Sequence, residues 1–223
     1  MAIYDEIKNK LPVAPLAVIA LDSAKNLSNG IDRYLVSARR EEEAFVCCDN
    51  DPSIQGYFRD TYITQARFPR FGTGEAKCIL DESVRGKDLF LICDVTNNSI
   101  TYRMNGFVNH MSPDDHYQDL KRVIAAAAGK AKRINIIMPF LYEGRQHRRS
   151  SRESLDCAFM LEELYSMGVD NFITFDAHDP RVANAIPLNG FDNYTPPTPF
   201  INALLNTERD LNIEGSSGSY FSG

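Results

Sequence analysis

Residues 134–153 read INIIMPFLYEGRQHRRSSRE, and this stretch decides the fold. It begins with an apolar run typical of a buried strand, and Pro139 ends that run because proline cannot donate to a strand ladder. A turn-prone segment follows, and then four arginines within eight residues, from Arg145 to Arg152. Open α/β sheets bind ligands beside the carboxyl ends of their strands. The stretch therefore predicts an α/β fold with a ligand site at the end of this strand.

The arginines suit an anionic ligand, since guanidinium forks match phosphate oxygens and also stack on bases. A solvated basic loop is the competing interpretation, but the position at the end of a core strand favours a multi-phosphate ligand. Asp176, His178 and Asp179 follow another predicted strand at the same sheet edge. They suggest Mg²⁺-nucleotide chemistry, because Mg²⁺ bridges phosphate oxygens and needs few protein ligands. Two alternatives stay open: His178 as a hydrogen-bonding loop residue, and Asp179 as a cap of the next helix.

The composition is that of a soluble globular protein, with 43% hydrophobic and 24% charged residues among 223. A net charge of −6 argues against a general nucleic-acid binder. The N-terminus lacks the features of a signal peptide, and no apolar stretch is long enough to span a bilayer. Five cysteines without a CxxC motif predict reduced thiols and a cytoplasmic protein. The histidines show no zinc spacing, so we expect no structural metal.

The hydrophobic pattern predicts alternating strands and helices. The expected strands are residues 16–21, 61–68, 75–80, 88–95, 134–138 and 171–175. The expected helices are residues 3–11, 28–40 with Ser28 as N-cap, 114–129 with Gly129 as C-cap, 154–167 with Phe159 on its core face, and 200–206. Residues 39–43 are expected to be a solvated helix end. Three segments are expected to be irregular: residues 50–53 as a loop, 97–111 without regular structure, and 214–223 as a flexible tail. The alternation from residue 88 onward implies a parallel sheet.

Four motifs occur in an order that resembles a known family. They are Phe71-Gly72-Thr73-Gly74-Glu75, Glu82-Ser83-Val84-Arg85-Gly86, Tyr142-Glu143-Gly144-Arg145-Gln146-His147-Arg148-Arg149 with Ser151-Arg152 further on, and Asp176-Ala177-His178-Asp179. Residues 68–205 resemble the N-terminal half of ribose-phosphate diphosphokinase, the synthetase of 5-phosphoribosyl diphosphate (PRPP). Residues 39–62 find no counterpart in this resemblance.

The resemblance implies a phosphoribosyltransferase-like fold, with a doubly wound, mostly parallel sheet and helices on both faces. It divides the chain into three parts. Residues 1–67 are an N-terminal extension with the first strand and helix, residues 68–206 are the domain core, and residues 207–223 are a flexible tail.

The resemblance also implies roles for individual residues. Arg145 and Gln146 would bind ATP, and His178 would be a ligand of Mg²⁺. Phe71, Thr73 and Glu75 would reach across a dimer interface to the adenine of a neighbouring subunit. In phosphate-activated, ADP-inhibited members, a regulatory anion site would be lined by Ser83, Arg85, Ser151 and Arg152. Subunits of the family form dimers that build a hexamer, so a homo-oligomer is expected.

Three positions depart from the family pattern. Thr73 stands where an acidic residue would contact the adenine amino group. His147 replaces an aspartate, and Asp179 replaces a small residue beside His178. These departures bear on base specificity and on the metal shell.

The loop that binds ribose 5-phosphate, the Pro-Asp-x-Gly-Gly metal segment and the catalytic Lys-Arg loop do not occur in this sequence. All three belong to the second half of the family's chain. We therefore expect the ATP-side domain of an enzyme that converts ATP and ribose 5-phosphate to PRPP and AMP, present here as a truncated or natural fragment. This half would hold no catalytic residue and would be inactive alone.

The alternative is a non-catalytic regulatory or assembly subunit of the same family, which the three departures favour. Nucleic-acid binding through the arginine-rich stretch is disfavoured, since no aromatic residues alternate with the arginines to stack on bases.

Overall fold

The computed structural model describes residues 13–43 and 56–207. Its strands are β1 (Leu16–Ala20), β2 (Ala66–Arg67), β3 (Ile79–Leu80), β4 (Asp88–Ile92), β5 (Thr101–Met104), β6 (Phe107–His110), β7 (Arg133–Ile137), β8 (Asn171–Phe175) and β9 (Gly190–Tyr194). Its helices are α2 (Lys25–Glu43), α3 (Pro113–Ala127), α4 (Asp156–Ser166) and α5 (Pro197–Thr207), with the 3₁₀ helices η1 (Asp22–Ala24) and η3 (Pro180–Ala185). The helix expected at residues 3–11, the loop at 50–53 and the tail at 214–223 lie outside the described residues.

Five of the described strands form one parallel sheet in the order β1-β4-β7-β8-β9, which confirms the parallel sheet expected from the sequence. Each strand pairs with the strand of this sheet that precedes it in the chain, without a reversal of order. One row of side chains crosses the sheet in register: Ile19, Leu91, Ile136, Phe172 and Phe191. The first four are fully buried, and burying each contributes about 1.5–3 kcal/mol. The apolar runs of the sequence thus become the core of the molecule.

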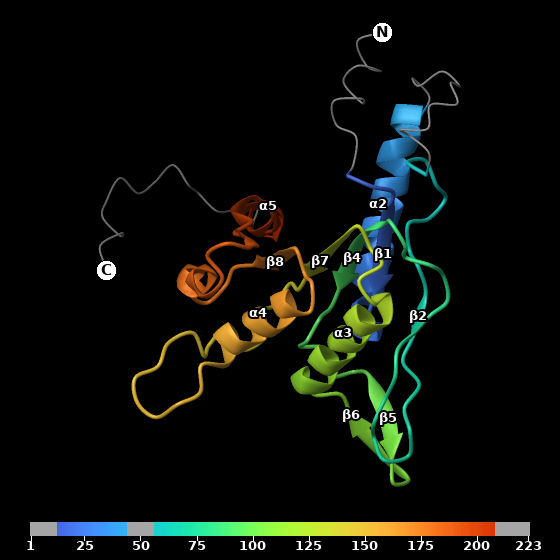
Figure 1. The fold of residues 1–223 in the computed structure, drawn as a ribbon. Helices are drawn as coiled ribbons and strands as arrows, with labels where there is room; N and C mark the ends of the chain where they lie inside the picture. The colour runs from blue at the N-terminus through green and yellow to red at the C-terminus, as the bar shows by residue number, and fades with distance from the viewer. Residues whose placement is uncertain (1–12, 44–55, 208–223) are drawn as a thin grey trace, which may run out of the picture.

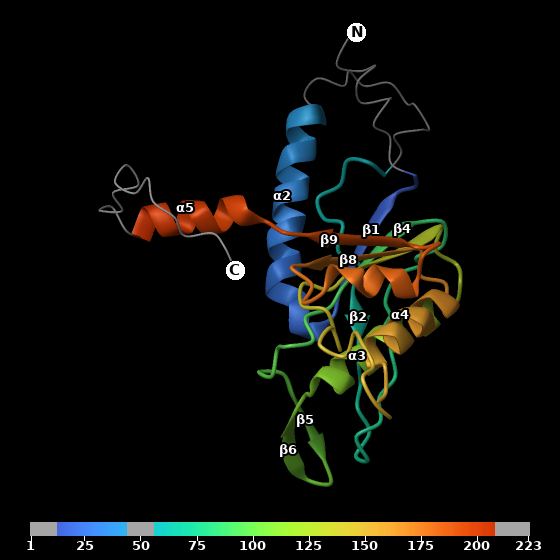
Figure 2. The same ribbon diagram turned by 90° about the vertical axis from the view of Figure 1, so that its left-hand side faces the viewer.

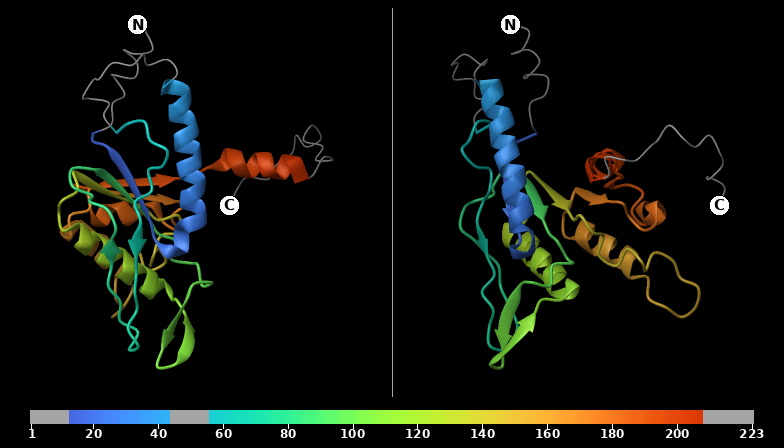
Figure 3. Two further views of the ribbon diagram at one scale, coloured as in Figure 1. Left: turned by 90° about the vertical axis from the view of Figure 1, so that its right-hand side faces the viewer. Right: turned by 180° about the vertical axis from the view of Figure 1, so that it is seen from behind.

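Helices cover both faces of this sheet, as the family resemblance implied (Figures 1 and 3). On one face, α3 and α4 pack against the apolar row through buried residues that include Leu120, Val123, Leu161 and Leu164. On the other face, α2 packs over β1 and β4, where Val18 and Ile92 point. The alternation of side chains along each strand separates the two cores.

A row of polar side chains lies at the amino ends of the central strands. Asn135 donates to Asp88 at 2.7 Å, and Asn171 donates to Asn135, also at 2.7 Å. Arg133 donates to the same Asp88 carboxylate at 2.9 Å. Buried polar groups need such partners, because an unpaired one costs about 1–3 kcal/mol. The row therefore fixes the register of β4, β7 and β8.

The hairpin of β5 and β6 contradicts the expectation that residues 97–111 are irregular. Its turn is Asn105-Gly106, with φ of 50° and 84°. Positive φ at both positions is the geometry of a two-residue type I′ hairpin, for which Asn-Gly is the preferred pair. The hairpin projects from the sheet beyond the start of α3 (Figure 1).

The helix starting near residue 28 was placed too late in the chain. α2 begins at Lys25, so Ser28 lies inside the helix, and its buried hydroxyl has no hydrogen-bond partner among the described residues. At the end of α2, Arg40 and Glu41 are exposed as expected, whereas the Arg39 guanidinium stacks over the rings of Tyr57 and Tyr62 at 4.1 and 4.6 Å. A cation over aromatic rings gains from their quadrupoles, so residues 57–62 are held to α2.

Two other helix features differ from expectation. Phe159 was expected on the core face of α4 but is 61% exposed. α3 ends one residue earlier than expected, with Ala128 as its C-cap at φ 48° and Gly129 following at φ 63°. The helix expected at residues 200–206 is present as α5, which begins three residues earlier; it projects away from the sheet (Figure 2), and its apolar residues Phe200 and Leu204 are exposed.

None of the described helices combines the length and the apolar character that crossing a membrane requires.

Candidate functional site

The carboxyl ends of β7 and β8 enclose a small cavity of about 160 Å³. It is lined by Phe140, Leu141, Gly144, Arg145, Phe175, Asp176, Ala177 and His178. The structure thus brings the arginine loop and the Asp-Ala-His-Asp segment together, as expected for neighbouring parallel strands. Phe140 and Phe175 were not singled out in the sequence, although each flanks a strand end and supplies an aromatic wall.

The arginine loop is shaped by its backbone. Glu143 has a left-handed φ of 56°, and Gly144 donates its backbone N–H to the Leu141 carbonyl at 3.1 Å. Gln146 donates to the Glu143 carbonyl at 2.8 Å, and its own carbonyl accepts from the Cys157 N–H at the start of α4. Gly144 is buried against Leu141, where a Cβ would be crowded. These turns present Arg145 and Gln146 toward solvent at the strand end.

Tyr142 fixes the base of this loop. Its ring stacks on Tyr117 of α3 with centroids 4.7 Å apart, and its hydroxyl donates to Asp114 at 2.5 Å. Burial and the nearby Asp114 raise the pKa of the Tyr142 hydroxyl, so it remains a donor. Burial likewise raises the pKa of the adjacent Glu143 carboxyl. The loop therefore starts from a rigid anchor.

The end of β8 is held by β9. Asp176 has a left-handed φ of 49°, and its backbone N–H donates to the Tyr194 carbonyl at 2.9 Å. The next N–H, that of Ala177, donates to the Asn193 side chain at 3.0 Å. Positive φ is uncommon outside glycine and often marks functional sites. This backbone turns Asp176 and His178 out of the sheet at the same edge as Arg145.

Asp179 caps the following helix, as one of the two alternatives predicted. Its carboxylate accepts from the backbone N–H of Arg181 at 2.9 Å and from the Arg181 side chain at 3.0 and 2.5 Å. These hydrogen bonds hold the pKa of the Asp179 carboxyl well below its usual range. Asp179 is therefore a carboxylate occupied by structural partners.

The remaining polar groups of the cavity are free to meet a ligand. Among the described residues, the Asp176 carboxylate and the Arg145 guanidinium make no hydrogen bond or ion pair, and the ring of His178 contacts that of His147. A carboxylate and an imidazole are suited to hold Mg²⁺ when phosphates and water complete its shell. Within the described ranges, no group of three or more His, Cys, Asp or Glu side chains is arranged to hold a metal ion by itself.

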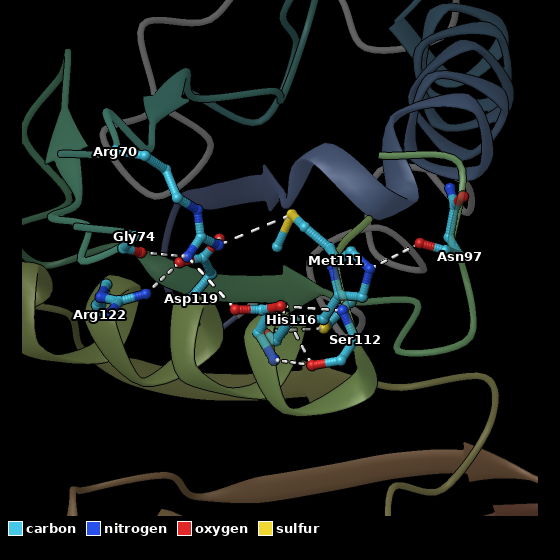
Figure 4. A network of polar contacts seen from close by, with 10 residues as sticks. Arg70, Gly74, Asn97, Met111, Ser112, His116, Asp119 and Arg122 are labelled. Atoms are coloured by element: carbon cyan, nitrogen blue, oxygen red, sulfur yellow. Dashed lines mark hydrogen bonds and ion pairs between the residues drawn. The ribbon is translucent and has the colours of Figure 1, made fainter. Parts of the chain in front are cut away.

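The glycine-rich turn at residues 71–75 is anchored from inside by Arg70, a residue that the sequence did not single out (Figure 4). The Arg70 guanidinium pairs with Asp119 of α3 at 2.8 Å and donates to the Gly74 carbonyl at 3.2 Å. It also lies over the Tyr102 ring of the hairpin at 4.5 Å. Gly72 accepts from the Asn105 N–H at the hairpin tip. The turn is thus held against both α3 and the hairpin.

The tip of this turn is open to solvent. Phe71 is 51% exposed, and Thr73 donates its hydroxyl to the Glu75 carboxylate at 3.0 Å. No contact within the described chain joins these side chains to Arg145 or His178. Their expected contact with a neighbouring subunit stays a prediction.

The four residues of the expected regulatory anion site do not meet in this chain. Ser83 and Arg85 precede β4, next to Gly86, whose N–H donates to the Lys130 carbonyl before β7. Ser151 and Arg152 lie in the loop that follows the opposite end of β7. All four side chains are exposed. The regulatory site stays a prediction.

Comparison with known families matches residues 16–168 to the N-terminal domain of ribose phosphate pyrophosphokinase. The resemblance carried by the motifs began only at residue 68, whereas this match already begins at β1. It therefore includes α2 and the segment at residues 39–62 that the motifs left unassigned.

Curated relatives carry the same name. The chain is 31% identical over 115 residues to ribose-phosphate pyrophosphokinase of Corynebacterium ammoniagenes, covering 51% of this chain and 32% of that protein. It is 27% identical over 121 residues to ribose-phosphate pyrophosphokinase 1 of Candida albicans, covering 54% and 34%. These alignments span about a third of each relative's length.

Among solved structures, the fold resembles that of phosphoribosylpyrophosphate synthetase from Mycobacterium smegmatis, with a TM-score of 0.64. The sequence identity is 19%, and the match covers 86% of this chain and 52% of the other. At this identity the likeness concerns the fold alone.

Proposed function

Since this chain belongs to the ribose-phosphate pyrophosphokinase family through its N-terminal domain, we propose that it is the ATP-side domain of a ribose-phosphate diphosphokinase. The observation that carries the proposal is the strand-end cavity. There, the guanidinium of Arg145 lies with the carboxylate of Asp176 and the imidazole of His178, and within residues 13–43 and 56–207 the first two groups have no hydrogen bond or ion pair. A cation for phosphate and donors for a metal at one sheet edge are the parts that a Mg·ATP site needs.

In the whole enzyme, the reaction is transfer of the β,γ-diphosphoryl group of ATP to the 1-hydroxyl of ribose 5-phosphate. The hydroxyl oxygen forms a bond to the β-phosphorus and loses its proton to water, and the bond from that phosphorus to the α,β-bridging oxygen breaks, which releases AMP. Arg145 would stabilise the charge on the phosphates, and Gln146 would hydrogen-bond to the nucleotide. This is catalysis by positioning and electrostatics, without a covalent intermediate on the protein.

Asp176 and His178 are the residues of this chain that would hold Mg²⁺. When bound, the ion would neutralise charge on the phosphate oxygens and orient them. Phe140 and Phe175 would keep water from one side of the site.

The size of the cavity indicates that other parts complete the site. Ligand pockets are commonly about 300–1,000 Å³, whereas this one is about 160 Å³. It can receive phosphates and a metal but not the whole nucleotide. The exposed Phe71, Thr73 and Glu75 of a neighbouring subunit would supply the adenine contacts, so we propose a homo-oligomer built from dimers. Ribose 5-phosphate would bind to the half of the family's chain that this sequence does not contain.

We also propose a cytoplasmic location and no nucleic-acid partner. Cys78, Cys93 and Cys157 are free thiols in the structure, which suits a reducing compartment.

The test is calorimetric titration of the chain with Mg·ATP. Wild type should bind, and Arg145→Ala with Gln146→Ala should weaken binding at least ~10-fold, a loss of about 1.4 kcal/mol. Arg103→Ala, an exposed arginine on β5, is the matched control and should bind as wild type. Equal binding by the double variant, or no binding by wild type at millimolar Mg·ATP, contradicts a nucleotide site in this chain.

A non-catalytic regulatory or assembly subunit is the second candidate. It is favoured by the three departures Thr73, His147 and Asp179, two of which lie beside the metal histidine. Such a subunit would change the sedimentation and turnover of a full-length synthetase from the same organism when the two are mixed. The first candidate, the ATP-side domain, is favoured instead if the chain binds Mg·ATP and changes neither the sedimentation nor the turnover of that synthetase.

A further inference from the structure

Two of the residues that depart from the family pattern touch each other. His147 Nε2 lies 3.3 Å from Asp179 Oδ2. The two residues are 32 positions apart, one on the loop after β7 and the other beyond the end of β8. The contact therefore joins the two segments that form the strand-end cavity.

Both side chains are enclosed, with 13% of His147 and 9% of Asp179 exposed. The carboxylate of Asp179 is held in place by Arg181 and by the cap it makes. The His147 ring also meets the ring of His178 edge-on, with centroids 5.3 Å apart. One imidazole thus contacts both the fixed carboxylate and the proposed metal ligand.

Little else ties the arginine loop to this segment. Among the described residues, each polar or ring contact between residues 145–155 and residues 176–181 is made by His147. Packing does not replace it, because a cavity of about 440 Å³ lies between the loop, α4 and η3. Arg148, Leu155 and Val182 line that cavity. The loop is therefore unsupported on the side away from the strand ends.

We propose that His147 and Asp179 are a pair of positioning residues, which hold the arginine loop so that Arg145 and His178 face the same cavity. This positioning role rests on the proposed nucleotide site, whereas the contact between His147 and Asp179 is present whether or not that site binds a nucleotide. Holding two binding groups in place before the ligand arrives removes the cost of ordering them on binding.

The two departures from the family pattern then depend on each other. An aspartate at position 147 would face the Asp179 carboxylate, and like charges at this distance repel. A small residue at position 179 would leave His147 without its partner. Histidine at position 147 and aspartate at position 179 are therefore each favourable only when the other is present.

The first experiment measures the contact without nucleotide, by amide hydrogen exchange. Two backbone amides report the order of the loop. The Gln146 N–H is hydrogen-bonded to the Glu143 carbonyl, and the Cys157 N–H is hydrogen-bonded to the Gln146 carbonyl. His147→Ala should speed exchange at both amides at least ~5-fold, and His147→Gln, whose side-chain amide can donate to Asp179, should leave them near wild type. The internal control is the N–H of Asn105 in the hairpin turn, which is hydrogen-bonded to the Gly72 carbonyl. Unchanged exchange in His147→Ala overturns the proposal.

The second experiment measures the consequence for the ligand, by titration with Mg·ATP. His147→Asp should weaken affinity ~10-fold through repulsion from Asp179, about 1.4 kcal/mol. Adding Asp179→Ser removes this repulsion, and because the serine hydroxyl can cap η3 or donate to the new carboxylate at position 147, affinity should return to within ~3-fold of wild type. A purely structural role predicts instead that the second substitution adds to the loss, and that outcome overturns the proposal.

The two experiments test the positioning role and the proposed function separately. If wild type does not bind Mg·ATP, the proposed function fails, while hydrogen exchange still decides whether His147 orders the loop. If wild type binds and the double variant does not recover, the positioning role fails and the nucleotide site stands.

Discussion

Arg70 and Asp119 form a buried ion pair, with 2.8 Å between Nη2 and Oδ2 and with 10% and 6% of their side chains exposed. The pair joins the turn at residues 71–75 to α3, 49 positions further along the chain. Burial raises the pKa of the Asp119 carboxyl, whereas Arg70 and Arg122 oppose that shift. The carboxylate therefore depends on its two arginine partners.

Arg70→Ala should lower the free energy of unfolding by about 3 kcal/mol, because removing one member of a buried pair leaves the other charge poorly compensated. Arg122 still pairs with Asp119, which keeps the loss at the lower end of the usual range. The matched control is Arg67→Ala, which breaks the exposed pair with Asp81 and should cost less than ~1 kcal/mol. Urea denaturation of the two variants measures the difference, and equal losses would contradict the importance of burial here.

Two glycines should respond to alanine in opposite directions. Gly30 lies within α2 with open space around it, so Gly30→Ala should stabilise the protein by about 0.5–1 kcal/mol. At Gly190, a new Cβ would overlap the side-chain oxygen of Asn171, which must then leave Asn135. Gly190→Ala should therefore cost about 1–2 kcal/mol. Thermal unfolding of both variants is the measurement, and stabilisation by Gly190→Ala would show that Asn171 can move freely.

Stability should fall in alkaline solution because of buried thiols. Burial raises the pKa of Cys157 to about 11 and that of Cys78 to about 11, from an ordinary value of 9.0. Between pH ~9 and pH ~11 the two thiols are ionised in the unfolded chain but still protonated in the folded chain, which favours unfolding as the pH rises. The contribution of the two thiols to the free energy of unfolding is therefore complete below pH ~9 and is lost toward pH ~11.

The measurement is the urea midpoint at several pH values between about 8 and 10.5, which lie inside this window. Cys157→Ala should flatten the alkaline slope relative to wild type, although the variant starts from lower stability. A slope that is identical in the two proteins would assign the alkaline loss to other groups.

The chain alone should form no PRPP from ATP and ribose 5-phosphate. The sequence contains no ribose-5-phosphate loop, and its alignment with the Corynebacterium ammoniagenes relative covers 32% of that protein. The assay is AMP and PRPP formation, with a full-length relative as positive control. Turnover by the purified chain that disappears in Arg145→Ala would refute this expectation.

The sequence predicted the parts of the fold that depend on local pattern. The strand at residues 171–175 was predicted at its observed bounds, because its apolar run lies between clear helix and turn signals. The meeting of Arg145 with His178 was also predicted, since parallel neighbours bring their carboxyl ends to one edge. Asn105-Gly106 could have revealed the hairpin, but this turn signal was overlooked.

Other features depend on contacts between distant residues and left no readable pattern. Ser28 looked like a helix cap, but η1 leads into α2 three residues earlier and places it inside the helix. His147 and Asp179 were each recognised as departures, but their contact follows from how the chain crosses between β7 and β8. The packing of α3 against the turn likewise brings Arg70 to Asp119.

The order of the parallel sheet has a consequence for how the protein is made. Within this sheet, each strand after β1, namely β4, β7, β8 and β9, pairs with the strand of the sheet synthesised just before it. During translation, the sheet can therefore grow at one edge as each new strand leaves the ribosome, with the N-terminal part first. No strand has to wait for a later one to insert between two that are already paired.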